Sequence, residues 1–123
     1  MTSSPKRIVM TNKTAEALAL LGLAMRAGAV ARGTDATRRA IQEGSALLVL
    51  LARDASSVQQ QKVLRLLEHR ETPRVSVGSR ADLGAAVGSA PISAIAITAG
   101  SFAEQVLGRL SPEAGVGPAI QER

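Results

Sequence analysis

The stretch ALLVLLA, residues 46–52, constrains the fold of this chain more than any other feature of the sequence. Seven apolar residues follow one another between the polar neighbours Ser45 and Arg53. A short continuous apolar run is typical of a strand that is covered on both faces, whereas a strand with one wet face alternates apolar and polar residues. We therefore expect a central strand with helices packed on both sides of its sheet.

The segments around this strand alternate between helical and extended patterns. We expect helices over residues 12–28, 34–44, 79–88, between 53 and 73, and from 101 onward, and strands over 29–32, 46–52, 74–77 and 94–98. Units of about 25 residues that alternate in this way are typical of α/β proteins. The predicted fold class is α/β, a three-layer α/β/α sandwich with a four-stranded mixed sheet.

Several local signals set the expected element ends. Gly28 is predicted to close the first helix and Thr34 to cap the second, while residues 53–57 (RDASS) offer caps for the third. The first helix is apolar nearly all round, which predicts burial on more than one side. Gly84 and Gly88 are interpreted as a small face that lets the fourth helix lie close to the sheet.

The chain of 123 residues is long enough for one domain. We expect residues 13–110 to form it, with a flexible arm over 1–12 and a disordered tail over 111–123, which is rich in Pro, Gly and charge. The apolar run 17–25 is bounded by Glu16 and Arg26, which favours a buried helix over a signal peptide. With no apolar run of membrane-spanning length, a cytoplasmic protein without a membrane partner is expected.

The positive charge is concentrated at one end of the sequence. The net charge is +5, and the first 39 residues carry all of the excess, with seven Lys or Arg against two acidic residues. Such an asymmetry indicates a polyanionic partner, because it creates a localised field. The only aromatic residue is Phe102, which excludes the nucleic-acid modules that stack bases on aromatic side chains.

Catalytic and metal-binding motifs are missing from the sequence. There is no cysteine, and His69 is the single histidine, so thiolate and multi-histidine metal sites are excluded. The glycines of residues 78–88 do not match a dinucleotide-binding pattern. Asp54 has no obvious partner base and is interpreted as a helix cap. We predict no catalytic residue, no metal and no cofactor.

The stretch ARGTDATRRAIQEG, residues 31–44, is the strongest candidate for a functional site. On a helix that begins near Thr34, Asp35, Arg38, Arg39 and Gln42 share one face, opposite Ala36, Thr37, Ala40 and Ile41. A solvated face with an Asp35–Arg39 ion pair is one interpretation. It leaves the crowding of Arg32, Arg38 and Arg39 at a positive helix end unexplained. Phosphates bound there by these arginines and by the N–H groups of Gly33 and Thr34 would explain it.

Three motifs occur in an order that resembles the ribosomal protein L7Ae/L30e family. They are LLGLAMRAGAVARGTDATRRAIQEG, LLVLLARDASS and VSVGSRADLGAAVGSAPISAIAIT, and the likeness covers about residues 14–107. The resemblance implies a three-layer α/β/α sandwich that binds kink-turn RNA, a sharply bent duplex with tandem sheared G·A pairs. It also implies that the helix opened by Gly33 enters the widened groove at the bend.

The resemblance assigns roles to individual residues. Gly33 matches a glycine that allows close backbone approach, and Arg39 stands where a guanine-reading lysine is common. Asp35 and Ala36 replace the asparagine and glutamate of the family pattern, and these two departures weaken the inference of kink-turn specificity. In the loop before the last strand, Pro91 and Ile92 are expected to cover an extruded base. The full predicted site is Arg32, Gly33, Thr34, Asp35, Ala36, Arg38, Arg39, Ser89, Pro91, Ile92 and Ser93, with the two serines reaching sugar or phosphate.

We therefore expect a non-catalytic RNA-binding protein that recognises structured RNA, with ribosomal RNA among the candidates, and that is a monomer when free. A protein–protein adaptor that keeps the fold but has lost kink-turn specificity is the alternative. A detached substrate-binding domain of an RNA-modifying enzyme is the weakest interpretation, since no set of catalytic groups supports it.

Overall fold

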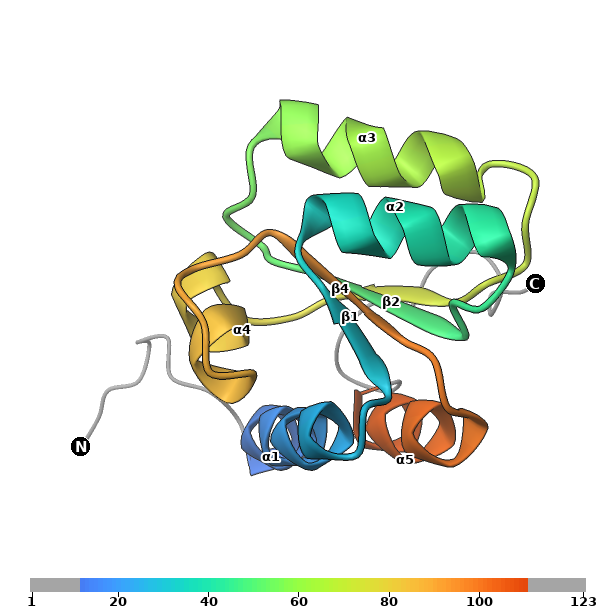
Figure 1. The fold of residues 1–123 in the computed structure, drawn as a ribbon. Helices are drawn as coiled ribbons and strands as arrows, with labels where there is room; N and C mark the ends of the chain where they lie inside the picture. Colours follow the sequence, from blue (N-terminus) through green and yellow to red (C-terminus); the bar gives the residue numbers. More distant parts are fainter. Residues whose placement is uncertain (1–11, 111–123) are drawn as a thin grey trace.

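The computed structural model describes residues 12–110, and the predicted tail and all but the last residue of the predicted arm lie outside this range. Five helices and four strands alternate along it (Figure 1). The helices are α1 (Asn12–Arg26), α2 (Thr34–Glu43), α3 (Ser57–Leu67), α4 (Arg80–Ala86) and α5 (Gly100–Leu110). The strands are β1 (Val30–Arg32), β2 (Leu48–Leu51), β3 (Arg74–Ser76) and β4 (Ala94–Ile97).

The four strands form one mixed sheet in the order β1-β4-β2-β3. β4 is antiparallel to both β1 and β2, and β2 is parallel to β3. Every residue of β2 and β4 is buried, as the apolar run predicts for a central strand. Strand β2 begins at Leu48, two residues later than expected, and Leu47 before it is 42% exposed.

Helices cover both faces of this sheet, so the predicted three-layer α/β/α sandwich is confirmed. Figure 1 shows α2 and α3 above the sheet and α1 and α5 below it, with α4 beside them. Alternate residues of β2 point to opposite layers: Leu48 and Leu50 join the core with α1, α4 and α5, whereas Val49 and Leu51 join the core with α2 and α3. Ile95 and Ile97 share one face of β4, as their spacing predicts.

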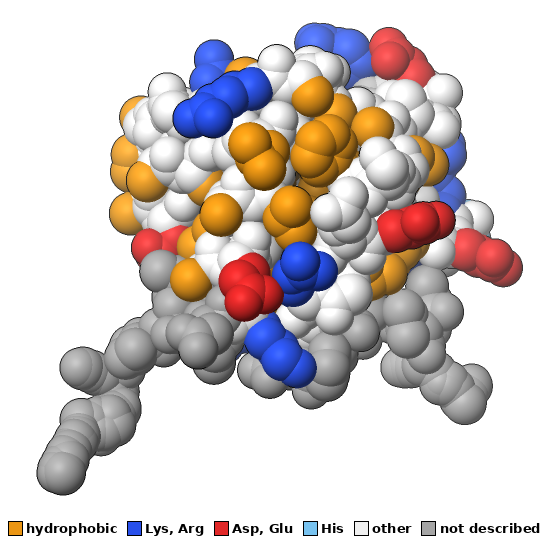
Figure 2. All heavy atoms as spheres, turned by 90° about the horizontal axis from the view of Figure 1, so that it is seen from below, with side chains coloured by type: hydrophobic (Ala, Val, Ile, Leu, Met, Phe, Trp, Pro, Cys, Tyr) orange, Lys and Arg blue, Asp and Glu red, His pale blue; other side chains and the backbone are white. Residues whose placement is uncertain are grey.

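Helix α1 is buried on part of its surface only. Ala17 and Leu21 are buried in the core with α4 and α5, and Ala24 is also buried. Ala19 and Leu23 point away from this core and are exposed. Figure 2 views the molecule from below and shows hydrophobic side chains gathered on this side. Apolar residues nearly all round the helix predicted burial on more than one side, but within the described residues the side of Ala19 and Leu23 is exposed.

Candidate nucleic-acid interface

Four turns meet at one edge of the sheet, and they include both segments of the predicted site. The Gly33 N–H donates to the Ala94 carbonyl oxygen at 2.9 Å, and the Ala52 N–H donates to the Ser93 carbonyl oxygen at 2.9 Å. The Arg53 N–H donates to the Gly78 carbonyl oxygen at 2.8 Å. These bonds place the start of α2 beside the loop that leads into β4, a proximity that can be followed in Figure 1.

Helix α2 begins without a side-chain cap. Gly33 occupies the cap position with φ 96° and makes no capping hydrogen bond, so the prediction that Thr34 is the cap is wrong. The Gly33 N–H is also unavailable to a phosphate because it is bonded to Ala94. The amides of the next three residues, 34–36, have no acceptor within the helix. They leave a partly positive helix end, and an added Cβ at Gly33 would meet no atom within 4 Å.

The arginines beside this end differ in their surroundings. Arg39 is exposed and Arg38 is half-buried. Within residues 12–110, neither Asp35 nor Arg39 has an ion-pair partner, so the Asp35–Arg39 pair that a solvated face would offer is not formed. The Nε of Arg38 is buried and has no hydrogen-bond partner among the described residues. Arg39 is therefore the accessible cation of the pair.

Arg32 has a structural partner. Its Nη1 donates to the carbonyl oxygen of Val87 at 3.0 Å, across 55 positions of sequence. This bond ties the end of β1 to the end of α4, where the loop of residues 87–93 begins. Arg32 therefore holds the two segments of the site together, and its role as a phosphate ligand stays a prediction.

The loop of residues 87–93 is shaped by a close backbone contact. A Cβ at Gly84 would overlap the carbonyl group of Ala90, so Gly84 lets this loop fold back onto α4. The expectation that Gly84 serves to bring the helix close to the sheet is therefore wrong. The Ser89 N–H donates to the Gly84 carbonyl oxygen at 2.8 Å, and the Ile92 N–H donates to the Arg80 carbonyl oxygen at 3.1 Å. The loop is held on both sides.

The side chains of this loop are not equally accessible. Pro91 is exposed, whereas Ile92 is half-buried and packs against the core with α1, α4 and α5. Pro91 is therefore accessible to an extruded base, whereas much of Ile92 is taken up by packing within the protein. The Ser89 hydroxyl donates to the Ala90 carbonyl oxygen at 2.7 Å. Ser93 is half-buried.

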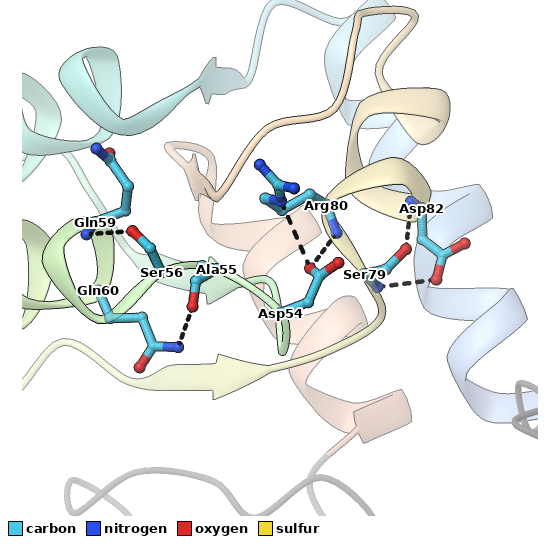
Figure 3. A network of polar contacts seen from close by, with 8 residues as sticks. All are labelled: Asp54, Ala55, Ser56, Gln59, Gln60, Ser79, Arg80 and Asp82. Carbon is cyan, nitrogen blue, oxygen red and sulfur yellow. Dashed lines mark hydrogen bonds and ion pairs between the residues drawn. The ribbon is translucent and has the colours of Figure 1, made fainter.

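The other two helices that begin at this edge are capped by their own side chains (Figure 3). The Ser56 hydroxyl accepts the Gln59 N–H at 3.2 Å at the start of α3. At the start of α4, Ser79 and Asp82 form a reciprocal capping box, with bonds of 3.0 and 2.9 Å. Asp54 accepts the Arg80 N–H at 2.8 Å, so it is a cap, as predicted, but it caps α4 from the loop before α3.

Two exposed cations at the same edge escaped the sequence interpretation. Arg53 follows β2 and Arg80 begins α4, and both are exposed. The Arg80 Nε lies 3.9 Å from the Asp54 carboxylate. The signal that could have found them is their position within four residues of the ends of two strands, because the carboxyl ends of the parallel strands β2 and β3 share an edge.

The described residues offer few other features that bear on function. Burial lowers the pKa of Arg74, which lies at the opposite end of the sheet and donates to the Thr72 carbonyl oxygen at 3.0 Å. Among residues 12–110, no group of three or more His, Cys, Asp or Glu side chains is placed to hold a metal ion. In the same range, no helix is long and apolar enough to cross a membrane.

Comparison with known proteins identifies relatives of this fold. The chain is 38% identical over 91 residues to the RNA-binding protein YlxQ of Bacillus subtilis, covering 74% of this chain and 91% of that protein. It is 34% identical over 83 residues to the large ribosomal subunit protein eL8 of Thermoplasma volcanium, covering 67% of this chain and 69% of that protein.

Solved structures give the same result for the fold. A Bacillus halodurans protein of unknown function superposes with a TM-score of 0.74 at 31% identity, covering 79% of this chain and 98% of that one. The Giardia lamblia 15.5kD RNA binding protein superposes with a TM-score of 0.69 at 23% identity, covering 89% of this chain and 98% of that one, a likeness of fold alone. A family model matches residues 15–107, and with these relatives it shows that the chain belongs to the ribosomal protein L7Ae/L30e/S12e/Gadd45 family.

Proposed function

We propose that this chain is a non-catalytic RNA-binding protein of the cytoplasm that recognises a kinked RNA with sheared G·A pairs, within the ribosome or another ribonucleoprotein. The observation that carries the proposal is the start of α2 without a side-chain cap, with the loop of Pro91 beside it. One turn away is the exposed Arg39, which has no ion-pair partner within residues 12–110. Positive charge and open amides favour binding of a phosphate backbone, and an exposed apolar tip favours contact with an unstacked base.

Each accessible group has a distinct role in the proposed complex. The Arg39 guanidinium donates to guanine O6 and N7 in bidentate fashion, and the Asp35 carboxylate accepts guanine N–H groups. The open amides of residues 34–36 bind a phosphate at the positive end of the helix dipole. Pro91 covers the base that the kink expels from the stack. Arg53 and Arg80 extend the positive surface along the same edge.

The relatives support the same class of partner. The Bacillus subtilis protein is named for RNA binding and the Thermoplasma protein for the large ribosomal subunit. Both align with at least two thirds of this chain. We propose structured RNA, with ribosomal RNA among the candidates, as the partner of this chain.

The departures at Asp35 and Ala36 favour one alternative, a protein–protein adaptor that keeps the fold. A carboxylate accepts hydrogen bonds but does not donate to guanine O6 as an amide does, and alanine does neither. The purified protein separates the two functions: nucleic-acid absorbance that high salt removes supports RNA binding, whereas a partner protein retained at high salt supports the adaptor.

A salt titration of RNA binding tests the proposal. The dissociation constant is measured for a kink-turn RNA, for the same RNA with its G·A pairs replaced by Watson–Crick pairs, and for a plain duplex. The kink-turn is expected to bind most tightly, and the logarithm of its binding constant to fall linearly with the logarithm of salt concentration because phosphate contacts release counterions. Equal affinity for the kink-turn and the plain duplex would refute kink-turn recognition.

A further inference from the structure

The outward face of α1 carries a regular pattern of side chains that the RNA site does not use. Glu16, Ala19, Leu23 and Arg26 follow one another at spacings of three, four and three residues, so they lie along one stripe of the helix. All four are exposed. Leu23 is 50% exposed and is one of three exposed large hydrophobic residues in the described range.

The surroundings of this stripe are also apolar. Leu20 of α1 lies beside the stripe, four residues after Glu16 and three before Leu23, and is only partly buried. Figure 2 shows hydrophobic side chains gathered on this side, with charged side chains around them. An apolar centre with a charged rim is typical of a surface that binds another protein.

We propose that this stripe is a self-association surface, which packs antiparallel against the same stripe of a second copy across a two-fold axis. In that arrangement the two-fold axis crosses α1 at the level of residue 21, whose own side chain points into the core. Stripe residues at equal distances along the helix on either side of this level face each other. Ala19 of each copy then lies opposite Leu23 of the other, so a small side chain meets a large one twice. Glu16 of each copy lies opposite Arg26 of the other, so an anion meets a cation twice.

The charges of the stripe are the reason to choose a second copy as its occupant. A surface of a single sign would suit a different partner of opposite sign, whereas this stripe has an acidic residue at one end and a basic residue at the other. Glu16 already accepts from the Arg109 Nε at 3.0 Å. This contact orients the carboxylate and leaves it further lone pairs for a second donor.

The expected strength follows from the size of the helix. Fifteen residues of α1 are roughly 22 Å long, and a single helix pair of this length buries less than the about 1,600 Å² typical of a stable interface. We expect a weak dimer that forms as concentration rises, with the monomer predicted from the sequence as its dilute form. Because α1 and α2 lie on opposite sides of the sheet (Figure 1), the dimer leaves the start of α2 open in both copies.

Sedimentation equilibrium of the full chain, without RNA and over a wide range of concentration, tests the proposal. The apparent mass of the wild type is expected to rise from monomer toward dimer. Leu23→Glu is expected to abolish this rise, and Arg26→Glu to weaken it by placing a carboxylate opposite Glu16. The matched control is Val58→Glu, which adds the same charge at a residue that is 63% exposed on α3, and it is expected to associate like the wild type.

The outcomes decide the proposal in either direction. Circular dichroism melting of each variant first establishes that it is folded. A rise in mass that Leu23→Glu removes and Val58→Glu keeps supports the α1 surface. A wild type that stays monomeric at every concentration overturns the proposal, and so does self-association that survives Leu23→Glu or that Val58→Glu removes equally.

Discussion

Three helices begin at the same edge of the sheet, and α2 begins differently from α3 and α4. The first turns of α3 and α4 are closed by Ser56 and by the Ser79–Asp82 capping box, with Asp54 adding a further bond to α4 (Figure 3). The first turn of α2 has a glycine in the cap position and no side-chain cap.

The difference shows where the protein leaves polar groups for a ligand. Open amides at a helix start are normally satisfied by a side-chain cap: alanine in place of a Ser or Asp cap costs about 1 kcal/mol, and glycine costs roughly a few tenths of a kcal/mol. Helices α3 and α4 have a side-chain cap, and α2 does not. Near this open end of α2, Arg39 has no ion-pair partner within residues 12–110. An anion that binds at this end restores what the missing cap would supply.

The largest effect is expected from removing the accessible cation of the open end. Arg39→Ala should weaken binding of a kink-turn RNA by about 1–3 kcal/mol, because a bidentate contact to guanine is lost. Discrimination between the kink-turn and its G·A-replaced form should fall with it. The control is Arg65→Ala, an equal loss of charge in the last turn of α3. If both variants lose the same affinity, α2 is not the reading element.

The second expected effect concerns the backbone at the start of α2. Gly33 and Gly28 have φ of 96° and 75°, and neither has an atom within 4 Å of an added Cβ. Alanine at either position should lower the free energy of unfolding by at least about 1 kcal/mol. Only Gly33→Ala should also weaken RNA binding, since its methyl group would lie at the open helix end. Thermal melts and RNA titrations of both variants make the comparison, and equal losses of RNA affinity would contradict it.

Removing a cap at a closed end should affect stability alone. Ser79→Ala breaks the capping box of α4 and should lower the free energy of unfolding by about 1 kcal/mol. Denaturant unfolding measures this loss, while RNA affinity under conditions where the variant is folded should match the wild type. Ser57→Ala, one residue past the cap of α3, serves as the control. A capped end that proves as important for RNA as the open end would remove the distinction.

The smallest effect is expected at the contact that joins the two segments of the site. Arg32→Met keeps most of the length of the side chain but loses the bond to the Val87 carbonyl oxygen, and should weaken RNA binding by about 0.5 kcal/mol. If Arg32 positions the loop, the slope of the logarithm of the binding constant against the logarithm of salt concentration should stay the same. A shallower slope would show instead that Arg32 contacts phosphate.

The fold was predictable because its signals are local and physical. An apolar run at 46–52 requires cover on both faces, and the serines at 56 and 79 cap the helices that follow them. Glycine at position 33 and the positive charge of Arg39 likewise indicated the start of α2 as the candidate RNA-binding site. These features depend on neighbours within about one turn or on a strand's own pattern, which a single sequence contains.

The details that sequence interpretation missed depend on distant contacts. The partner of Arg32 lies 55 positions away, and the Gly33 N–H bonds to Ala94 in the adjacent strand. Helical spacing places Arg38 and Arg39 on one face, but only the packed structure shows that Arg38 is half-buried. Ile92 was expected to cover an extruded base, but it is partly buried against a core that is assembled from α1, α4 and α5, which its local sequence does not show.

Amide hydrogen exchange with and without a kink-turn RNA tests the central claim most directly. The amides of residues 34–36 have no acceptor within α2 and should exchange fast in the free protein, while those that Ser56 and Ser79 cap exchange more slowly. RNA is expected to protect residues 34–36 and the loop at 89–93 and to change the exchange at the starts of α3 and α4 much less. RNA-induced protection that leaves residues 34–36 unchanged would contradict it.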